Sequence, residues 1–246
     1  SGAKALCESL DYVQGIDTHD VMTKEDKLNG NEALFADDKL HMNAAGYAVF
    51  SNYLRQVIFG LEPVEGYHFG NVEGYVTTGG IDLSKDTEEN GTVSVNGGGT
   101  QYGYLKNSFA DKLYVEAEFN VSQVLNNDAW PKFGLMLNGK TEMVSFYVDM
   151  TTNLTSHAVG IVHCPTGGSY DWGNSVQTAV SGMAFTGENK VKLAVVRDGN
   201  DVYFYVNDVL VMRKIGVLAA ENTAAGIFTF NTQLTASNYI LKTGDA

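Results

Sequence analysis

The chain has little cysteine, little proline and little basic charge for its 246 residues. Its two cysteines, Cys7 and Cys164, are too few for a disulfide framework, and neither stands in a Cys-x-x-Cys or Cys/His cluster. Sixteen basic against 29 acidic residues give a net charge of −13, which disfavours nucleic acid and anionic membranes. Apolar runs such as 191–196 are too short or too interrupted to cross a bilayer. We therefore expect neither a nucleic-acid nor a membrane partner.

What the chain does have is enough apolar residues to form a buried core. A hydrophobic fraction of 44% and a charged fraction of 18% exclude a disordered or fibrous chain. The length allows one large domain or two modest ones. No basic, apolar signal segment follows Ser1, so we expect the chain to be cut from a longer protein.

Residues 1–62 have the pattern of a short α/β fragment. Residues 12–17 predict a brief strand, residues 24–32 a polar loop, and residues 43–59 one long helix, because their apolar positions keep helical spacing. One strand cannot make a sheet, and the helix has no partner within the segment. We therefore expect this region to be the end of a domain whose beginning lies upstream.

Residues 63–246 change to short alternating runs separated by Gly, Asn and Asp. In 112–121, apolar and polar residues alternate as in a half-buried strand, and Gly199 and Asn207-Asp208 predict tight hairpin turns. Many short strands without a helix predict a mostly β chain with an antiparallel β-sandwich, because two sheets bury their apolar faces against each other. The other runs predicted as strands are 132–137, 142–150, 157–163, 190–197, 201–206, 209–214, 224–230 and 236–241.

The sharpest chemical signal is the motif Asp38-x-x-His41, in a polar loop before the predicted helix. An acid at this spacing can hold one imidazole nitrogen, which leaves the other to take a proton from a nucleophile. Asn43 is predicted to cap the helix through its side-chain oxygen. The alternative is a polar helix-entry loop without catalytic function, because the motif alone is short.

This stretch resembles the last motif block of the SGNH (GDSL-type) hydrolases, where Asp-x-x-His is followed by Asn or Pro and then by Gly-Tyr. Asn43, Gly46 and Tyr47 complete the pattern here, and the resemblance covers residues 3–60. It implies a serine hydrolase that removes acyl groups, often from polysaccharides. In that role, Asp38 would orient the imidazole and His41 would be the general base.

The chain departs from this family at the nucleophile. The family's serine lies in a Gly-Asp-Ser block near the start of the domain, and no Gly-Asp-Ser occurs in this sequence. The family's oxyanion donors lie in middle blocks that are also absent. Acyl transfer needs all these groups within hydrogen-bond reach. We therefore expect the chain alone to be inactive and the missing catalytic region to lie upstream.

The second region loosely resembles the concanavalin A-like and laminin-G-like jelly rolls. The hairpin over 191–206 carries the resemblance: an alternating strand ends in Arg197 and a Gly turn, and a Tyr-Val-Asn-type strand follows. The resemblance implies a jelly roll, a fold that houses binding modules and glycosidases alike. Jelly-roll glucanases carry Glu-x-Asp-x-x-Glu on one strand. The nearest stretch, Glu116-Ala117-Glu118, lacks the third acid, so we expect these residues on a solvent face.

A glycan-binding sandwich needs aromatic side chains on which sugar rings can stack. Tyr170 and Trp172 lie in a Gly-rich stretch, 162–176, that predicts a long loop, and loops on a rigid sandwich often bind ligands. Trp130, beside a run of Asn and Asp, is the third candidate. The alternative for each is an aromatic that packs down on the core as a lid.

No cofactor and no metal is expected. Acidic residues are densest at Asp82, Asp86, Glu88 and Glu89, but their spacing misses the Asp-x-Asp-x-Asp-Gly calcium loop. The histidines of the second region also lack ligand-like spacing.

Two functions remain open. In the first, the chain is the C-terminal part of a modular, exported or cell-surface carbohydrate or acyl esterase. Residues 1–62 then end its catalytic domain, and residues 63–246 bind a polysaccharide or acylated glycan. The alternative is a free-standing carbohydrate-binding or adhesion module in which residues 1–62 are an appendage. An upstream Gly-Asp-Ser strand would favour the first, and a natural start at Ser1 would favour the second.

Overall fold

The structure is a computed structural model that describes residues 22–23, 30–59, 61–63, 74–82, 91–96, 98–109, 112–125, 130–151, 157–165, 170–180, 190–219 and 221–244. The chain divides into two compact units, Ser1–Gly60 and Leu61–Ala246. The strand predicted at 12–17 and most of the loop predicted at 24–32 lie outside the described residues.

The first unit contains a short 3-10 helix, η1 (Glu32–Leu34), and the predicted long helix, α3 (Ala44–Phe59). Asn43 caps α3 as expected: its Oδ1 accepts a hydrogen bond from the Gly46 N–H at 3.0 Å. Its Nδ2 donates to the carbonyl oxygens of Ala33 in η1 and of Phe35 just after it, each at 2.9 Å. Position 46 needs glycine because a Cβ there would lie 2.0 Å from the Leu34 carbonyl oxygen. The helix start is therefore held tightly against η1.

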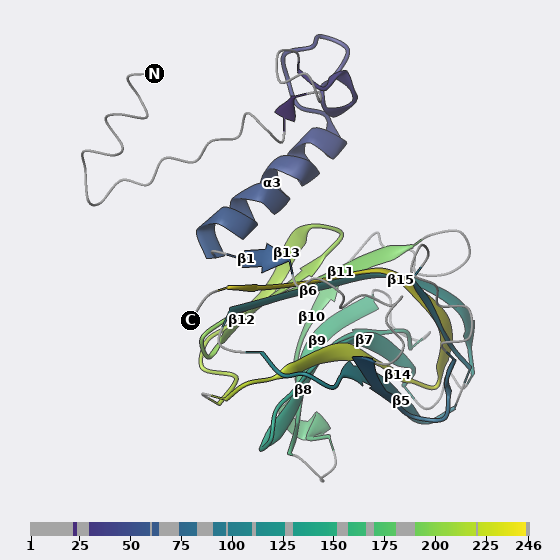
Figure 1. The fold of residues 1–246 in the computed structure, drawn as a ribbon. Helices are drawn as coiled ribbons and strands as arrows, with labels where there is room; N and C mark the ends of the chain where they lie inside the picture. The colour runs from purple at the N-terminus through teal and green to yellow at the C-terminus, as the bar shows by residue number, and fades with distance from the viewer. Residues whose placement is uncertain are drawn as a thin grey trace. The chain divides into compact units, whose positions relative to one another are not determined.

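The second unit is built from antiparallel strands in two sheets (Figure 1). The described strands of the first sheet are, in spatial order, β13 (Val209–Lys214), β12 (Asp201–Val206), β11 (Val191–Asp198), β6 (Lys112–Val124), β15 (Thr232–Gly244), β4 (Thr92–Val95) and β3 (Ile81–Asp82), with β1 (Leu61–Pro63) paired to β15. Those of the second are β10 (Val176–Val180), β9 (His157–Pro165), β8 (Glu142–Asp149), β7 (Lys132–Asn138), β14 (Ala224–Phe230), β5 (Thr100–Leu105) and β2 (Tyr75–Thr77). The predicted jelly-roll β-sandwich is confirmed.

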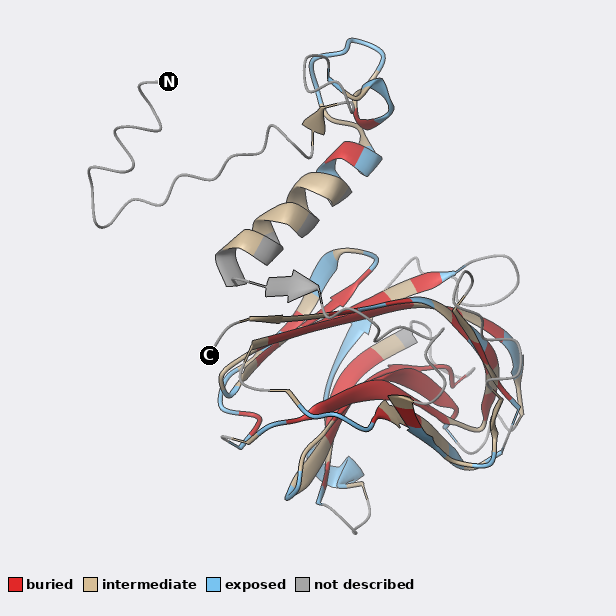
Figure 2. Ribbon diagram, in the orientation of Figure 1, coloured by how far each residue is buried: buried red, intermediate tan, exposed pale blue. Residues whose placement is uncertain are grey.

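The core lies between the two sheets, where buried residues line both layers (Figure 2). Aromatic rings join the layers: Phe119 of β6 packs on Phe133 of β7 with ring centroids 5.3 Å apart. Phe146 of β8 packs on Phe204 of β12 at 5.8 Å. The strand alternation predicted from sequence is the cause, because it turns one apolar face of each sheet inward.

The two predicted hairpin turns are present. Gly199, between β11 and β12, has φ +61°, and Asn207 and Asp208, between β12 and β13, have φ +47° and +66°. Gly, Asn and Asp adopt this left-handed backbone most readily, and two-residue hairpin loops require it. The turn residues therefore fix the register of three neighbouring strands.

Arg197 at the end of β11 is fully buried, with 0% of its surface exposed. Its guanidinium donates to the Gly199 carbonyl at 2.8 Å, to the Thr223 hydroxyl at 3.0 Å and to the Ala219 carbonyl at 3.3 Å. The rigid fork of donors thus ties the β11–β12 hairpin to the segment that precedes β14. This is the physical role of the arginine before the Gly turn.

One element was predicted wrongly. The stretch 162–176 is not one long loop: β9 continues to Pro165, which pairs with Glu142 of β8, and β10 begins at Val176. A short 3-10 helix, η4 (Trp172–Asn174), lies between the two strands. Pairing to β8 extends β9 into residues whose glycine and proline neighbours suggested a loop.

The last strand is longer than predicted for a different reason. β15 runs from Thr232 to Gly244, and its pairing with β6 shifts between Gln233 and Leu234 and again between Ser237 and Ile240. The first shift places an extra residue in β6, and the second places one in β15, where it interrupts the period-two alternation. The run predicted at 236–241 contains this second shift and leaves out the two ends of the strand, which pairing with β6 identifies.

Candidate functional site

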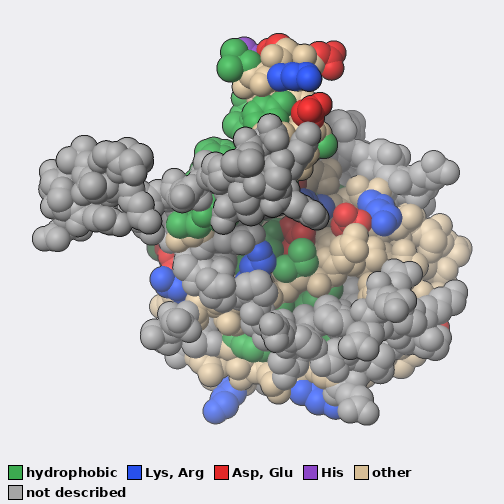
Figure 3. Space-filling view, turned by 45° about the horizontal axis from the view of Figure 1, so that its top comes forward, with side chains coloured by type: hydrophobic (Ala, Val, Ile, Leu, Met, Phe, Trp, Pro, Cys, Tyr) green, Lys and Arg blue, Asp and Glu red, His purple; other side chains and the backbone are tan. Residues whose placement is uncertain are grey.

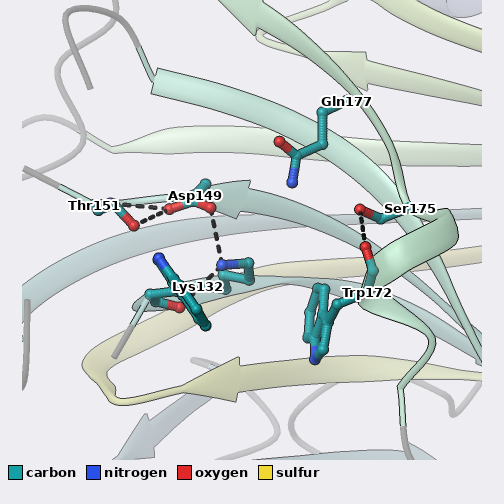
Figure 4. A pocket seen from close by; sticks show the side chains of 7 residues that line it. Lys132, Asp149, Thr151, Trp172, Ser175 and Gln177 are labelled. Atoms are coloured by element: carbon teal, nitrogen blue, oxygen red, sulfur yellow. Dashed lines mark hydrogen bonds and ion pairs between the residues drawn. The ribbon is translucent and has the colours of Figure 1, made fainter. Parts of the chain in front are cut away.

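A cavity of about 350 Å³ opens on the outer face of the second sheet (Figure 4). It is formed by the start of β7, the end of β8, and the segment that leads from η4 into β10. Its lining residues are Trp130, Lys132, Asp149, Thr151, Trp172, Ser175 and Gln177.

A buried ion pair forms one wall of this cavity (Figure 4). The Lys132 Nζ lies 2.8 Å from the Asp149 Oδ2, and the two side chains are only 6% and 8% exposed. Lys132 also donates to the Trp130 carbonyl at 3.0 Å. The Asp149 Oδ1 accepts from the Thr151 N–H at 3.0 Å and from its hydroxyl at 2.5 Å. Both charges are therefore compensated and held in place.

Tyr147 contributes a buried ring beside the ion pair. The Lys132 ammonium lies 5.6 Å from the Tyr147 ring centroid and 5.1 Å from the Trp172 ring, both within range of a cation–π interaction. Gln177 donates to the Tyr147 hydroxyl at 2.5 Å, and burial raises the pKa of that hydroxyl. Gly160 of β9 makes room for the ring, because a Cβ there would lie 2.5 Å from it.

The tryptophans Trp130 and Trp172 are the exposed aromatic side chains of the cavity, at 66% and 39% of their surface. They are the two tryptophans of the whole sequence. Trp130 also has a φ of +49°, a left-handed backbone that is unusual for a bulky residue and is typical of functional positions. The fold thus brings two of the three aromatic candidates into one cavity.

Tyr170, the third candidate, supports Trp172 instead of lining the cavity. Its ring centroid lies 5.1 Å from that of Trp172 and 6.0 Å from that of Phe228. Its hydroxyl is 3.1 Å from the Ser145 hydroxyl, and burial raises its pKa to about 12. This is the packed arrangement that the alternative interpretation described, and it fixes the position of the neighbouring indole.

Sequence reasoning missed the polar lining of the cavity. Lys132 and Asp149 stand directly opposite each other in the β7–β8 register. A usable signal was present: both strands were predicted, and opposite charges at matching hairpin positions predict a cross-strand pair. The remaining polar residues, Thr151, Ser175 and Gln177, lie outside or at the ends of regular strands, where no spacing rule points to one face.

The Asp38–His41 pair of the first unit has the predicted geometry. The Asp38 Oδ2 lies 2.6 Å from the His41 Nδ1, and the Asp38 Oδ1 accepts from the N–H groups of Leu40 at 2.9 Å and His41 at 3.0 Å. These bonds, above all the one from the imidazole, lower the pKa of Asp38. The His41 side chain is 72% exposed, and Figure 3 shows a histidine among charged side chains at one end of this unit.

The arrangement holds the imidazole by Nδ1. A tight turn makes this possible, because the Ala36 N–H donates to the His41 carbonyl at 2.8 Å and Lys39 adopts a φ of +56°. All these contacts join residues close in sequence. The local motif is therefore sufficient to position both side chains.

The glucanase alternative finds no support in the first sheet. Glu116 was expected on a solvent face, yet it is buried: it accepts a hydrogen bond from Tyr114 and lies 3.9 Å from the Lys192 ammonium. Glu118 pairs with Lys190 at 3.2 Å. Among the described residues that line the cavity of the second sheet, Asp149 is the one carboxylate, whereas glycosidases use two.

Among the described residues, no group of three His, Cys, Asp or Glu side chains could hold a metal ion. Asp86, Glu88 and Glu89 lie outside the described ranges. Cys164 is buried, which raises its pKa, and Cys7 is not among the described residues. No helix in the described part of the chain has the length and apolarity to span a membrane.

No known protein family matches the sequence, and no similar sequence was found among curated proteins. Solved structures share the fold. A carbohydrate-binding module, CBM66, from Bacillus subtilis is 18% identical, with a TM-score of 0.50 over 69% of this chain and 96% of its own. The metal-free carbohydrate recognition domain of Emp46p is 8% identical, with a TM-score of 0.52 over 76% and 100%. A laminarinase from Flavobacterium sp. UMI-01 is 14% identical, with a TM-score of 0.51 over 75% and 100%. The structural similarity supports the jelly-roll sandwich. Because the sequence identities are low, the function of the site depends on the residues of this chain.

Proposed function

We propose that the sandwich is a carbohydrate-binding module and that its ligand occupies the cavity between Trp130 and Trp172. One observation carries the proposal: both tryptophans of the chain are exposed and converge on one cavity. Large exposed aromatics on a soluble protein mark binding surfaces, and indole faces suit the C–H faces of sugar rings.

The polar lining supports the same ligand class. Thr151, Ser175 and Gln177 present hydroxyl and amide groups beside the indoles, as a site for a polyhydroxylated ring requires. The described residues that line the cavity include one carboxylate, Asp149, which favours binding over glycoside hydrolysis. Two of the solved structures with this fold are themselves described as a carbohydrate-binding module and a carbohydrate recognition domain.

Tryptophan fluorescence tests the proposal directly, because every tryptophan of the chain lies at the site. In a screen of soluble glycans we expect at least one to change the emission with a Kd in the micromolar to millimolar range, about −4 to −8 kcal/mol. Trp172→Ala should weaken binding about tenfold or more, a loss of about 1.4 kcal/mol.

Tyr203→Ala is the matched control, because this tyrosine lies in the first sheet, where its ring contacts Arg213. That variant should bind as the unchanged chain does. A second cavity of about 450 Å³, lined by Tyr104, Asn138 and Glu221 among others, contains no tryptophan. Heat of binding in calorimetry without a change in tryptophan emission would indicate that the ligand binds in this second cavity. If the folded chain binds no glycan at all, the proposal is refuted.

The geometry of Asp38 and His41 favours a second, separate proposal. Residues 1–62 would be the end of an SGNH-type hydrolase domain, and the parent protein would be an exported or cell-surface modular esterase acting on acylated glycans. The Asp38–His41 contact of 2.6 Å supports it, because a carboxylate on Nδ1 is what a general-base histidine needs. The competing alternative is a free-standing binding or adhesion module.

Hydrolysis of p-nitrophenyl acetate separates these alternatives. The chain alone should show no turnover above buffer, because no Gly-Asp-Ser stretch supplies a nucleophile. A longer protein that contains such a stretch should be active, and His41→Ala should abolish its turnover. Trp172→Ala should leave turnover of this small ester intact. A longer natural protein without esterase activity would leave the binding module as the whole function.

A further inference from the structure

We infer, on the basis of the proposed function, that the cavity between Trp130 and Trp172 selects uncharged sugars. The Lys132–Asp149 pair binds their hydroxyl groups as one neutral unit. The pair is buried in the cavity wall, and among the described residues that line the cavity it carries the charge.

Lys132 is held so that it can still donate to a ligand. An ammonium has three N–H donors, and the described residues accept two of them, at Asp149 and at the Trp130 carbonyl. The ammonium also lies over the Trp172 ring, beside the indole on which a sugar would stack. The third donor is accepted by neither of these two groups and is therefore left for a ring hydroxyl of the ligand.

Asp149 is held in the complementary way. A carboxylate offers about four acceptor positions, and three are taken by Lys132 and by the N–H and hydroxyl of Thr151. The remaining position can accept from a second hydroxyl of the same ring. Lysine and aspartate side by side thus match a pair of adjacent hydroxyls, one of which accepts while the other donates.

A charged sugar would disturb this balance. Because Lys132 and Asp149 neutralise each other at 2.8 Å, a uronate, sulfate or ammonium group would find no uncompensated opposite charge here. It would lose its water on entering the site without a counter-charge to replace that water, whereas the same transfer costs far less for a hydroxyl group. Among the described residues that line the cavity there is no arginine to offer a carboxylate the bidentate contact that it prefers. The net charge of −13 further opposes polyanions.

Binding of three groups of polymers to the full chain tests the inference. The groups are neutral (laminarin, glucomannan, arabinoxylan), anionic (polygalacturonate, alginate) and cationic (chitosan), and the readout is tryptophan emission at 50 and 500 mM NaCl. We expect binding within the neutral group alone, with a Kd that changes less than about twofold between the two salt concentrations.

Asp149→Asn provides the sharpest variant, because it keeps the shape and the acceptor for Thr151 but leaves Lys132 without its counterion. We expect this variant to gain binding to polygalacturonate or alginate, of which the unchanged chain shows none, and to lose about tenfold or more in affinity for the neutral ligand. Circular dichroism and a thermal melt verify that the variant is folded. The double variant Lys132→Met, Asp149→Leu removes both charges and leaves no buried charge without a partner. It should lose binding to the neutral ligand and gain no binding to anionic polymers.

The outcomes separate the two proposals. If the unchanged chain binds a uronan or chitosan and Trp172→Ala abolishes that binding, the inference is overturned while the binding function stands. If Asp149→Asn is folded and gains no anionic ligand, the role assigned to the ion pair is overturned. If no polymer of any group binds, both proposals fail.

Discussion

The two compact units place their candidate chemistry by opposite means. In the first, Asp38 and His41 are three positions apart, and every bond that orients them joins neighbours in sequence. In the second, the cavity takes Trp130, Asp149 and Trp172 from segments that only sheet pairing brings together. The comparison teaches that a local motif can be recognised without a fold, whereas a site on a sheet requires its register.

The difference extends to the supporting residues. Around Asp38 the support is a turn and a capped helix, with Asn43 and Gly46 as its main elements. Around the cavity it is buried packing: Tyr170 beneath Trp172, and Gly160 beside Tyr147. Damage to the first unit should therefore remain local, while damage to the sandwich should spread through a cooperative core.

The largest effect is expected for Arg197→Ala in the sandwich. The variant removes three donors from a fully buried position and leaves the Gly199 and Ala219 carbonyls without them, so we expect a loss of about 3–5 kcal/mol in unfolding free energy. Urea unfolding followed by tryptophan emission measures it. Arg213→Ala is the matched control, because that side chain is 53% exposed and should matter by less than about 1 kcal/mol. Equal effects for the two arginines would contradict the assignment.

An intermediate effect is expected for Gly46→Ala in the first unit. The new Cβ would lie 2.0 Å from the Leu34 carbonyl oxygen, so the start of α3 must shift, at about 1–3 kcal/mol. Hydrogen exchange of the first α3 amides, beginning with Tyr47, should become faster while β-strand amides are unaffected. Gly79→Ala is the control, because nothing lies within 4 Å of its added Cβ. Slower exchange at the first α3 amides would contradict the expected loosening of the helix start. Changes that also appear at β-strand amides would show that the two units do not respond separately.

The smallest effect concerns pH. The pKa of Asp38 is lowered, mainly by the His41 imidazole, so its bonds persist above the ordinary carboxyl pKa and are lost as the pH falls through the lowered value. His41→Ala should raise the Asp38 pKa toward its ordinary value, about 3.9, in a carboxyl NMR titration. Glu221 is the control: its pKa is lowered mainly by the Thr141 N–H, so His41→Ala should leave it unchanged. An Asp38 pKa that stays low in the variant would assign the effect to the backbone donors.

Much of the sandwich was predictable because its signals are periodic. The strands Val209–Lys214 and Ala224–Phe230 lie where alternation and turn residues placed them, and the Asn207-Asp208 turn adopts the expected backbone. Short strands that contain Gly, Ser or Thr, such as β4 and β5, have too few residues to be recognised singly, even where they alternate as β4 does. Their identity as strands comes from partners: β4 pairs with β15, and β5 pairs with β14.

The candidate site was predictable in part. Trp130 and Trp172 stood out because large aromatics in polar, Gly-rich surroundings are unusual, yet nothing in the sequence joined them. Tyr170 carried the same signal but is a partly buried support, because its ring packs against Phe228 of a distant strand. The distinction between a lining and a supporting aromatic thus depended on a neighbour remote in sequence.

The sequence by itself determined the alternation of the strands, the hairpin turns, the helix with its Asn43 cap and the Asp38–His41 contact, because each depends on residues only a few positions apart. The tertiary structure decided which sheet faces carry charge and which aromatics stay exposed. It placed Lys132 opposite Asp149, set Tyr170 beneath Trp172 and buried Arg197, since these outcomes follow from strand register and from packing across long sequence distances.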